Sequence, residues 1–454
     1  MADAQPIEVA ESAGLLTEED LRRSGDRRRV LEARRGGRRF GLLWLLVGPG
    51  VLAMLGENDG PSMLSYAASG AAYGIGFFLP FIAVSFLAAI IVQEMTMRVG
   101  AVTHRGYGEL IFQRFGRFWG WLSAVDLVVT NLVTLITELI AIRVGMSFFG
   151  IPPVVAVAFG LGLVIFSISG GRYWRWERVA LAIAGFNMLF LLAAVLTRPD
   201  PAAIDRAFLT WSPLPSGSLQ LFLLLVASNI GATVTPWMLF FQQSAVVDKG
   251  MTPKDIPQGR IDTILGGLLA AAAGIGALVA AAVLYYHHVD SSHLQGGAGF
   301  AQALLPFTGY PVAAIFALGL IEAGALATMT ISASTAYALG EALSGPHSFN
   351  RKLSDAPSFY GFNIGIALIA AVVVLIPGAP LLSITLNANL LATILMPAAL
   401  VFLLLLANDP ELMGPRRNPL WLNIAGGVVC FLVGLAGTAY AVVAFLNVVG
   451  VRVG

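Results

Sequence analysis

The sequence predicts an all-α integral membrane protein of eleven transmembrane helices, arranged as two inverted repeats of five helices and one further span. The chain has 454 residues, of which 57% are hydrophobic and only 12% are charged. Its apolar segments reach the roughly 18–20 residues that a helix needs to cross a bilayer. Two of these segments, five spans apart, are interrupted by polar residues, Gly and Pro, which is the pattern of an inverted repeat with broken helices.

The predicted spans are separated by charged or loop-forming segments. They cover residues 41–70 (interrupted), 75–97, 118–147, 152–169, 178–197, 218–246 (interrupted), 262–286, 311–341, 361–377, 381–406 and 420–448. We expect residues 40–197 to form the first repeat, residues 218–406 the second, and residues 420–454 the last span with an external C-terminus. Residues 1–39 hold nine Arg and no long apolar run, so we expect a disordered cytoplasmic tail. A contact of this tail with anionic lipid or with a partner is the alternative.

The positions of Lys and Arg predict the orientation of the chain. If the N-terminus lies in the cytoplasm, 23 of the 27 Lys and Arg residues fall on the inner side. Only Arg198, Arg206 and Arg452 fall outside, and Arg143 lies within a span. Because inner loops are enriched in positive charge, we predict a multi-pass protein of a prokaryotic-type plasma membrane, with its N-terminus inside and its C-terminus outside. The single cysteine, Cys430, excludes an intramolecular disulfide.

The first interrupted span contains the residues most suited to binding a cation. Its apolar run ends in Glu-Asn-Asp-Gly-Pro-Ser at residues 57–62, at about the depth of the bilayer centre. An acid at that depth is costly and usually faces a cavity or the interior of the bundle. Gly and Pro break the helix and free backbone carbonyls. Together, the carbonyls and the carboxylate of Asp59 form a candidate cation site.

The sixth predicted span has a matching interruption. Residues 227–238 read Ala-Ser-Asn-Ile-Gly-Ala-Thr-Val-Thr-Pro-Trp-Met, with Pro236 near the middle of the span. A single proline-kinked helix is usually structural. Two breaks at matching positions, one of which carries an acid, predict instead a substrate site at the midplane between the repeats.

At these two breaks the chain resembles the NRAMP family of divalent-metal transporters. That family has Asp-Pro-Gly-Asn in its first helix and Ala-Thr-Val-Met-Pro-His-Asn in its sixth, where this chain has Asp-Gly-Pro-Ser (residues 59–62) and Ala-Thr-Val-Thr-Pro-Trp-Met (residues 232–238). Gly-Pro-Gly at residues 48–50 and Ser-Ala-Val at residues 244–246 extend the likeness. The resemblance covers most of the first seven spans, is weaker beyond them, and implies the LeuT-type fold.

The departures from the family pattern imply a different metal preference. The position of the family's thioether-bearing Met is Thr235 here, and the position of its first-helix Asn is Ser62. The implied metal ligands are then Asp59, Ser62, Thr235 and the main-chain carbonyl of Ala232. These are hard oxygen donors, which suit Mg²⁺, Ca²⁺ or Mn²⁺ better than softer metals. The combination resembles the NRAMP-related magnesium transporter branch, which implies import of Mg²⁺, and of Mn²⁺, as a partly hydrated ion.

Five further residues are expected around this site. Asn58 and Glu57 precede the acid, and we expect Glu57 to lie outside the ligand shell because two adjacent carboxylates repel each other. Trp237 and Met238 are expected to form a gate or to pack beside the site. Asn389 aligns loosely with an amide that the family uses near its metal; the alternative is an interhelical hydrogen bond.

The resemblance also bears on proton coupling. The family's third helix reads Thr-Asp-Leu-Ala-Glu, whereas residues 130–134 here read Thr-Asn-Leu-Val-Thr, and the family's sixth-helix His is Trp237. Because a proton relay needs a chain of titratable groups, we expect transport without proton coupling. Glu138, Asp126 and Glu322, together with Glu57, remain as an alternative proton or charge route.

Several other functions were weighed. The alternatives are a proton-coupled Mn²⁺/Fe²⁺ transporter of the main family, a non-transporting metal sensor on the same fold, and an amino-acid symporter, which the acid Asp59 disfavours. No nucleotide-binding or catalytic motif is present, so we expect no enzymatic activity, no resident cofactor, and no nucleotide or nucleic-acid partner. We expect a monomer in the lipid bilayer, with hard divalent cations as its ligands. The loop residues His287, His288 and His293 are expected to be solvated rather than to collect metal.

Overall fold

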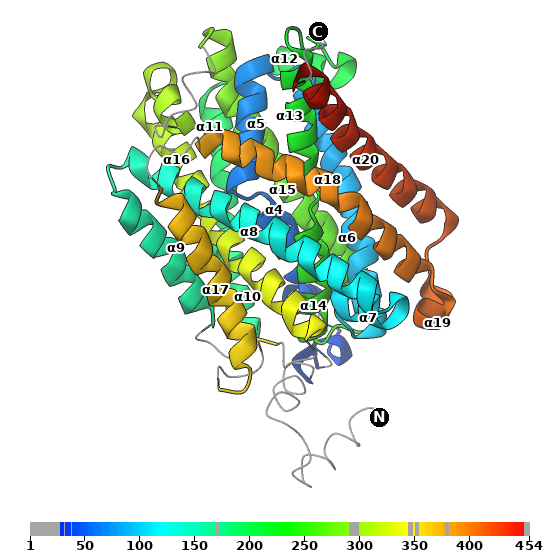
Figure 1. Cartoon of the computed structure of the whole chain (residues 1–454). Coiled ribbons are helices and arrows are strands. Elements are labelled where there is room, and N and C mark those ends of the chain that lie inside the picture. The colour runs from blue at the N-terminus through cyan, green and yellow to red at the C-terminus, as the bar shows by residue number, and fades with distance from the viewer. Residues whose placement is uncertain are drawn as a thin grey trace.

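A computed structural model describes residues 28–30, 32–37, 39–168, 173–289, 299–343, 348–349, 354–376 and 381–448. The described residues form a bundle of helices and contain no strand (Figure 1). Nine of their helices are long and apolar enough to cross a membrane, or ten if the bent pair Phe40–Leu46 and Pro49–Glu57 is one span. The helix over Pro153–Phe166 is apolar but shorter. The all-α, multi-pass architecture is therefore confirmed, and the count of eleven spans stays a prediction.

The first half of the chain contains helices at the positions of the first five predicted spans and one short helix outside them. They are α3 (Arg39–Leu46), α4 (Pro49–Glu57), α5 (Gly60–Tyr73), α6 (Phe78–Thr103), α7 (Tyr107–Phe115), α8 (Arg117–Phe148), α9 (Pro153–Ile168), α10 (Tyr173–Ala184), the 3₁₀ turn η1 (Gly185–Met188) and α11 (Leu189–Leu196). The short helices α7 and α12 (Pro201–Thr210) were not expected, because neither is long enough to give a membrane-spanning signal.

The second half contains the helices expected for the remaining spans. They are α13 (Leu219–Gly231), α14 (Pro236–Asp248), α15 (Ile256–Tyr286), α16 (Gly299–Ala342), α17 (Pro357–Val374), α18 (Leu381–Asn408), the short α19 (Pro410–Met413), the 3₁₀ turn η3 (Gly414–Arg416) and α20 (Leu420–Val448). In Figure 1, α3 and the last turns of α20 lie at opposite ends of the molecule.

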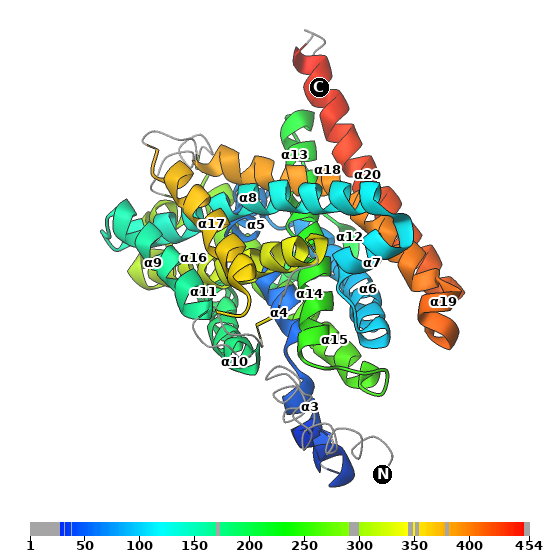
Figure 2. The ribbon, with the colours of Figure 1, turned by 60° about the horizontal axis from the view of Figure 1, so that its bottom comes forward.

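Long helices enclose the short ones. Helix α8 packs along α16, and α15 packs against α4, α5 and α6. Figures 1 and 2 show α4, α5 and α14 in the middle of this arrangement, with α9, α17 and α20 towards the outside. The interrupted helices therefore lie at the centre, where side chains from several helices can reach them. Many large apolar side chains on α20 and α15, such as Phe431 and Leu268, are exposed, as expected for a surface that faces lipid.

Two features were not predicted from the sequence. The first span has a bend of 54° between α3 and α4, before the predicted break. Gly48 lies at this bend and Pro49 begins α4, so the bend falls where helix continuity is weakest. In α16, Gly309 has a left-handed backbone (φ 77°), so the helix is kinked before the predicted span of residues 311–341 continues.

Residues 1–27 lie outside the described residues, so the predicted disorder of the tail stays a prediction. Residues 32–35 are helical. Arg34 contacts the loop before α15, where its guanidinium donates to a carboxylate oxygen of Asp255 over 2.5 Å. The end of the tail thus lies against the bundle.

Candidate metal site

The first interrupted span breaks between α4 and α5. Helix α4 ends at Glu57, Asn58 and Asp59 leave the helical conformation, and α5 begins at Gly60. Asp59 is the N-cap of α5, and its carboxylate accepts a hydrogen bond from the backbone N–H of Ser62 at 2.8 Å. The carboxylate is thereby fixed at the positive end of the α5 dipole, within the bundle.

The second interrupted span breaks over four residues. Helix α13 ends at Gly231, and α14 begins at Pro236. Thr235 precedes Pro236 in an extended conformation, as expected for a residue before proline. Because its side chain makes no capping bond to α14, the Thr235 hydroxyl is available to the other break.

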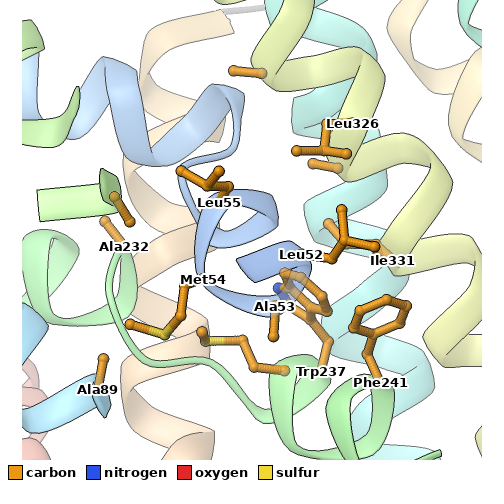
Figure 3. Close-up of a cluster of buried hydrophobic side chains, with 14 of the residues drawn as sticks. Leu52, Ala53, Met54, Leu55, Ala89, Ala232, Trp237, Phe241, Leu326 and Ile331 are labelled. Carbon is orange, nitrogen blue, oxygen red and sulfur yellow. The ribbon is translucent and has the colours of Figure 1, made fainter. Parts of the chain in front are cut away.

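Two of the hydrogen bonds between the broken spans involve residues of the second break. The Thr235 hydroxyl donates to Oε2 of Glu57 over 2.7 Å. The phenol of Tyr66, on α5, donates to the main-chain carbonyl of Ala232 over 2.6 Å. Figure 3 shows Leu55 and Ala232 on neighbouring segments of the two spans, with Trp237 below them. The predicted meeting of the two breaks is thus present in the structure, and Thr235 and Ala232 both face the first span.

Unsatisfied polar atoms lie at the first break. Glu57 and Asp59 are 0% and 1% exposed. Oε1 of Glu57 and the hydroxyl of Ser62 are buried and have no hydrogen-bond partner among the described residues. A buried polar atom without a partner costs about 1–3 kcal/mol, so such atoms usually mark a place for water, an ion or a ligand.

Glu57 lies where the two breaks meet, through its bond to the Thr235 hydroxyl. We expected Glu57 outside the ligand shell, and that expectation stays a prediction. Glu57 is the last residue of α4 while Asp59 caps α5, so the two carboxylates are carried by different helices.

A third acid reaches the first break from α8. Oε2 of Glu138 accepts a hydrogen bond from the backbone N–H of Gly60 over 2.9 Å, and its other oxygen has no partner among the described residues. The approach requires glycine, because a Cβ on Gly60 would lie 2.1 Å from the Cβ of Ala141. The described residues contain no group of three or more His, Cys, Asp and Glu with the geometry of a preformed metal centre. A bound cation would therefore need hydroxyl, carbonyl or water ligands as well as carboxylates.

The likeness seen at the two breaks extends over most of the chain. Residues 50–443 match the model of the family described as Natural resistance-associated macrophage protein-like, Nramp. The chain belongs to the Nramp family. It is 26% identical over 419 residues to a protein named Divalent metal cation transporter MntH from Mycobacterium tuberculosis, covering 86% of this chain and 90% of that one. A protein of the same name from Listeria welshimeri is 24% identical over 410 residues, covering 87% and 89% of the two chains.

Solved structures agree on the fold. A manganese transporter of Eremococcus coleocola, in complex with an aromatic bis-isothiourea substituted compound, superposes with a TM-score of 0.75 at 19% identity, covering 91% of this chain and 90% of that one. The structure of MhsT in complex with L-phenylalanine superposes with a TM-score of 0.57 at 12% identity, covering 87% and 97%. These likenesses confirm the predicted LeuT-type fold class.

In this Nramp chain, Asn131 and Thr134 stand where the family has acids in its third helix, and both side chains make hydrogen bonds inside the bundle. The amide of Asn131 donates to the Thr335 hydroxyl over 2.9 Å, and the hydroxyl of Thr134 donates to the carbonyl of Thr130 over 2.9 Å. The first bond joins α8 to α16, and the second lies within α8. Neither side chain can bind and release a proton near pH 7.

The side chain of Asn58 makes its hydrogen bonds to residues of η1 and α15 rather than to the second break. Its amide donates to Oδ1 of Asn187 over 2.9 Å and to the carbonyl of Ala270 over 2.7 Å. Asn187 in turn donates to the carbonyl of Asn58 over 3.3 Å and to Oε2 of Glu322 over 3.2 Å. Glu322 is therefore connected to the first break through one amide, whereas Glu138 reaches it directly.

The other predicted neighbours of the site differ in position. Trp237 and Met238 are fully buried, and the main-chain carbonyl of Trp237 accepts a hydrogen bond from Ser334 over 3.1 Å. Asn389 donates to the hydroxyl of Ser65 over 2.9 Å, which corresponds to the alternative of an interhelical bond. Asp126 is only half-buried, and it lies twelve residues, or about 18 Å of helix, before Glu138.

A group of polar contacts holds the start of α4. The carboxylate of Asp262, on α15, accepts from the backbone N–H groups of Gly48, Gly50 and Val51 at 2.9, 2.6 and 3.2 Å. Lys249, at the end of α14, donates to the carbonyl of Val47 over 2.8 Å. It also pairs with the buried carboxylate of Glu177 over 2.8 Å. Any movement of the start of α4 away from α15 and Lys249 must break these bonds.

Three residues of this site were missed by sequence reasoning. Tyr66 and Asp262 lie outside the quoted site motifs, and their bonds join helices that are far apart along the chain. Asn187 carried a signal that was overlooked, since an amide within an otherwise apolar span usually bonds another helix.

Two further features lie outside the site. Arg143, which lies within the third predicted span, donates from its guanidinium to the carbonyl of Val374 over 2.7 Å. The ring of His287 stacks on Phe307 with centroids 4.5 Å apart, and His288 is exposed. His293 lies outside the described residues.

Proposed function

We propose that this Nramp protein imports Mg²⁺, and also Mn²⁺, as a partly hydrated ion by alternating access. Family membership, together with relatives named as divalent metal cation transporters and a similar structure named as a manganese transporter, supports divalent-metal transport. The choice of Mg²⁺ is the finer part of the proposal and rests on the residues at the two breaks.

The chemistry of the donor set carries this choice. The contacts across the two breaks use the carboxylate of Glu57, the hydroxyl of Thr235 and the carbonyl of Ala232, and the carboxylate of Asp59 and the hydroxyl of Ser62 lie beside them. All of these donors are hard oxygens, which Mg²⁺ and Mn²⁺ accept readily. Mg²⁺ gives up its waters reluctantly and is commonly held by one or two carboxylates with water completing the shell.

The proposed transport is not coupled to protons. The family's third-helix acids correspond to Asn131 and Thr134 here, and the side chains at these positions bond to other helix groups. The membrane potential alone can drive entry, because a divalent cation gains about 4.6 kcal/mol per 100 mV.

One observation favours a second candidate, a proton-coupled Mn²⁺ transporter. The acids Glu57, Asp59 and Glu138 are all buried at the first break. A cluster of buried acids can exchange a proton when a cation enters or leaves. The number of protons moved with each metal ion distinguishes this candidate from transport without proton coupling.

Metal uptake into liposomes tests both candidates. Purified protein is reconstituted with a Mg²⁺ dye or a pH dye inside the vesicles, and an inside-negative potential is imposed. The native chain is compared with Asp59→Asn and with a control, Asp205→Asn, which changes an exposed acid of α12 away from the breaks. We expect saturable Mg²⁺ entry at constant internal pH in the native chain and in the control, and none in Asp59→Asn.

Other outcomes would redirect the proposal. Mn²⁺ uptake with acidification, without Mg²⁺ uptake, would establish the proton-coupled candidate. Mg²⁺ uptake that Asp59→Asn leaves intact would move the site away from the first break. If neither ion crosses, the remaining candidate is a metal sensor on the same fold.

A further inference from the structure

A second site of different chemistry lies at the end of the molecule that the charge pattern predicts to be cytoplasmic. A cavity of about 710 Å³ is bounded by the tail before α3, the end of α6, the start of α15 and the segment between α19 and α20. Its lining contains six cationic side chains: Arg34, Arg98, Lys254, Arg260, Arg416 and Arg417. In Figure 2, α3, the ends of α6 and α15, and α19 lie towards the same end of the molecule.

The positive charge of this cavity is only partly balanced. Asp255 pairs with Arg34 over 2.5 Å. Glu94 is shared between Arg98 and Arg260, at 3.2 and 2.9 Å. The positive charge of the lining therefore exceeds the charge of these two carboxylates.

Arg416 and Arg417 provide part of that excess. In the described part of the chain, neither side chain makes a hydrogen bond or an ion pair, and both are exposed. On most protein surfaces such arginines are simply hydrated, so their exposure alone does not indicate a ligand.

The construction of the wall distinguishes this cavity from an ordinary charged surface. Arg98 is 3% exposed, and its guanidinium donates to the carbonyl of Arg416 over 2.6 Å and to Oδ1 of Asn418 over 2.5 Å. It thus fixes the backbone that carries Arg416 and Arg417. Four prolines also line the cavity: Pro253, Pro257, Pro415 and Pro419. Because proline fixes φ, the cationic side chains project from a rigid frame, which lowers the entropy lost on binding.

The surface next to the cavity is apolar. On α15, Ile261, Leu265 and Leu268 are exposed directly after Arg260, and on α20, Trp421 and Ile424 are exposed directly after Pro419. A tryptophan at this position is typical of the boundary between headgroups and hydrocarbon. A ligand with a phosphate at one end and acyl chains at the other could use both surfaces, whereas a free phosphate would use only the cations.

We propose that this cavity binds the phosphate headgroup of an anionic phospholipid from the inner leaflet. Arg416, Arg417 and Lys254 contact the phosphate oxygens, and the acyl chains lie along the exposed faces of α15 and α20. Arginine suits this role because its planar guanidinium binds a phosphate through two parallel hydrogen bonds. Basic pockets between transmembrane helices on the cytoplasmic side are known to take such headgroups.

Native mass spectrometry of the full-length protein in detergent tests the proposal. The protein is titrated with phosphatidylglycerol or with phosphatidylcholine, and the fraction carrying bound lipid gives an apparent Kd. The test variant is Arg416→Gln with Arg417→Gln. The matched control is Arg117→Gln with Arg178→Gln, which removes two exposed arginines predicted to lie on the same side but outside the cavity.

We expect phosphatidylglycerol to bind in preference to phosphatidylcholine and the test variant to bind it roughly 30-fold more weakly, with the control unchanged. Lys254→Gln, on another wall of the cavity, provides an independent variant and is expected to weaken binding by about fivefold. Competition with inorganic phosphate distinguishes the two sources of the phosphate group, and we expect phosphate at the same concentration not to displace the lipid.

Three results would overturn the proposal. Equal weakening in the control would mean that diffuse surface charge attracts the lipid. Displacement by an equal concentration of inorganic phosphate would assign the cavity to a free anion. Unchanged binding in both the double variant and Lys254→Gln would exclude the cavity altogether.

Discussion

The contact between Asp262 and the start of α4 predicts how firmly α4 is held against α15. Oδ1 of Asp262 accepts from Gly48 and Val51, and Oδ2 accepts from Gly50 at 2.6 Å. In Asp262→Asn one of these two atoms becomes an NH₂ group, which cannot accept a hydrogen bond. Whichever way the amide is turned, at least one backbone N–H of α4 loses its partner.

The size of the effect follows from the kind of bond that is lost. A hydrogen bond to a charged group contributes about 1.5–3 kcal/mol. If this bond forms only while α4 is docked, its loss raises the population of the undocked state about 10- to 100-fold. The bond between Lys249 and Val47 remains, so we expect opening to become more frequent without unfolding of the protein.

Labelling of a buried cysteine measures this population. Ala53 lies on α4 and is 0% exposed, and Figure 3 shows it beside Trp237. In an Ala53→Cys reporter that also carries Cys430→Ser, the labelling rate by a thiol reagent is proportional to the open population when closing is faster than labelling. Asp262→Asn should raise that rate 10- to 100-fold by the estimate above.

Asp255→Asn is the matched control. Asp255 is also buried and predicted to lie on the same side, but its carboxylate accepts from Arg34 and Thr252 rather than from α4. It should leave the labelling rate unchanged. An unaltered rate in Asp262→Asn would refute the idea that these bonds hold α4 in place. An equal rise in Asp255→Asn would show a general loosening of this end of the bundle.

Two further predictions concern the breaks themselves. Gly60→Ala would place its Cβ 2.1 Å from the Cβ of Ala141, so α5 and α8 must separate. We expect this variant to lose metal uptake and to be destabilised by about 1–3 kcal/mol in thermal unfolding. The control Gly162→Ala changes an exposed glycine with no atom within 4 Å of the new Cβ, and it should affect neither uptake nor stability. Thr235→Val removes the hydroxyl that donates to Glu57, so the metal concentration for half-maximal uptake should rise about tenfold. Thr235→Ser keeps a hydroxyl and should have the half-maximal concentration of the native chain. If the valine and serine variants behave alike, the hydroxyl has no role.

The location of the two breaks could be predicted from the sequence because both carry a local signal. An acid within an apolar run, followed by Gly60 and Pro61, has few explanations in a membrane helix. Pro236 among small residues gives a similar but weaker signal. The two signals together also predicted the broken helices α4–α5 and α13–α14, since an inverted repeat brings such breaks together.

The partners of these residues could not be predicted in the same way. Tyr66 bonds Ala232 across 166 positions, and Gly60 meets Glu138 across 78. Such pairs depend on the packing angles between helices, which hydropathy does not encode. The bend at Gly48 has a local signal, because Gly-Pro-Gly at residues 48–50 weakens a helix, but this signal was overlooked within an otherwise apolar run.

The hydrogen bonds at the breaks bear on how an ion would be bound. The Thr235 hydroxyl donates a hydrogen bond to Glu57, and the Tyr66 phenol donates one to the carbonyl of Ala232. Two of the proposed ligand atoms, the hydroxyl oxygen of Thr235 and the carbonyl oxygen of Ala232, therefore already have hydrogen-bond partners. These bonds hold the oxygens near each other despite the unfavourable burial of carboxylates. Each of these two oxygens still keeps a lone pair that a cation could use, because a hydroxyl or carbonyl oxygen has two. Oε1 of Glu57 and Oγ of Ser62, which lack partners among the described residues, offer further acceptor positions to the waters of a partly hydrated ion that contacts Asp59 directly. The proposed import of Mg²⁺ as a partly hydrated ion would use these positions, since Mg²⁺ gives up its waters reluctantly.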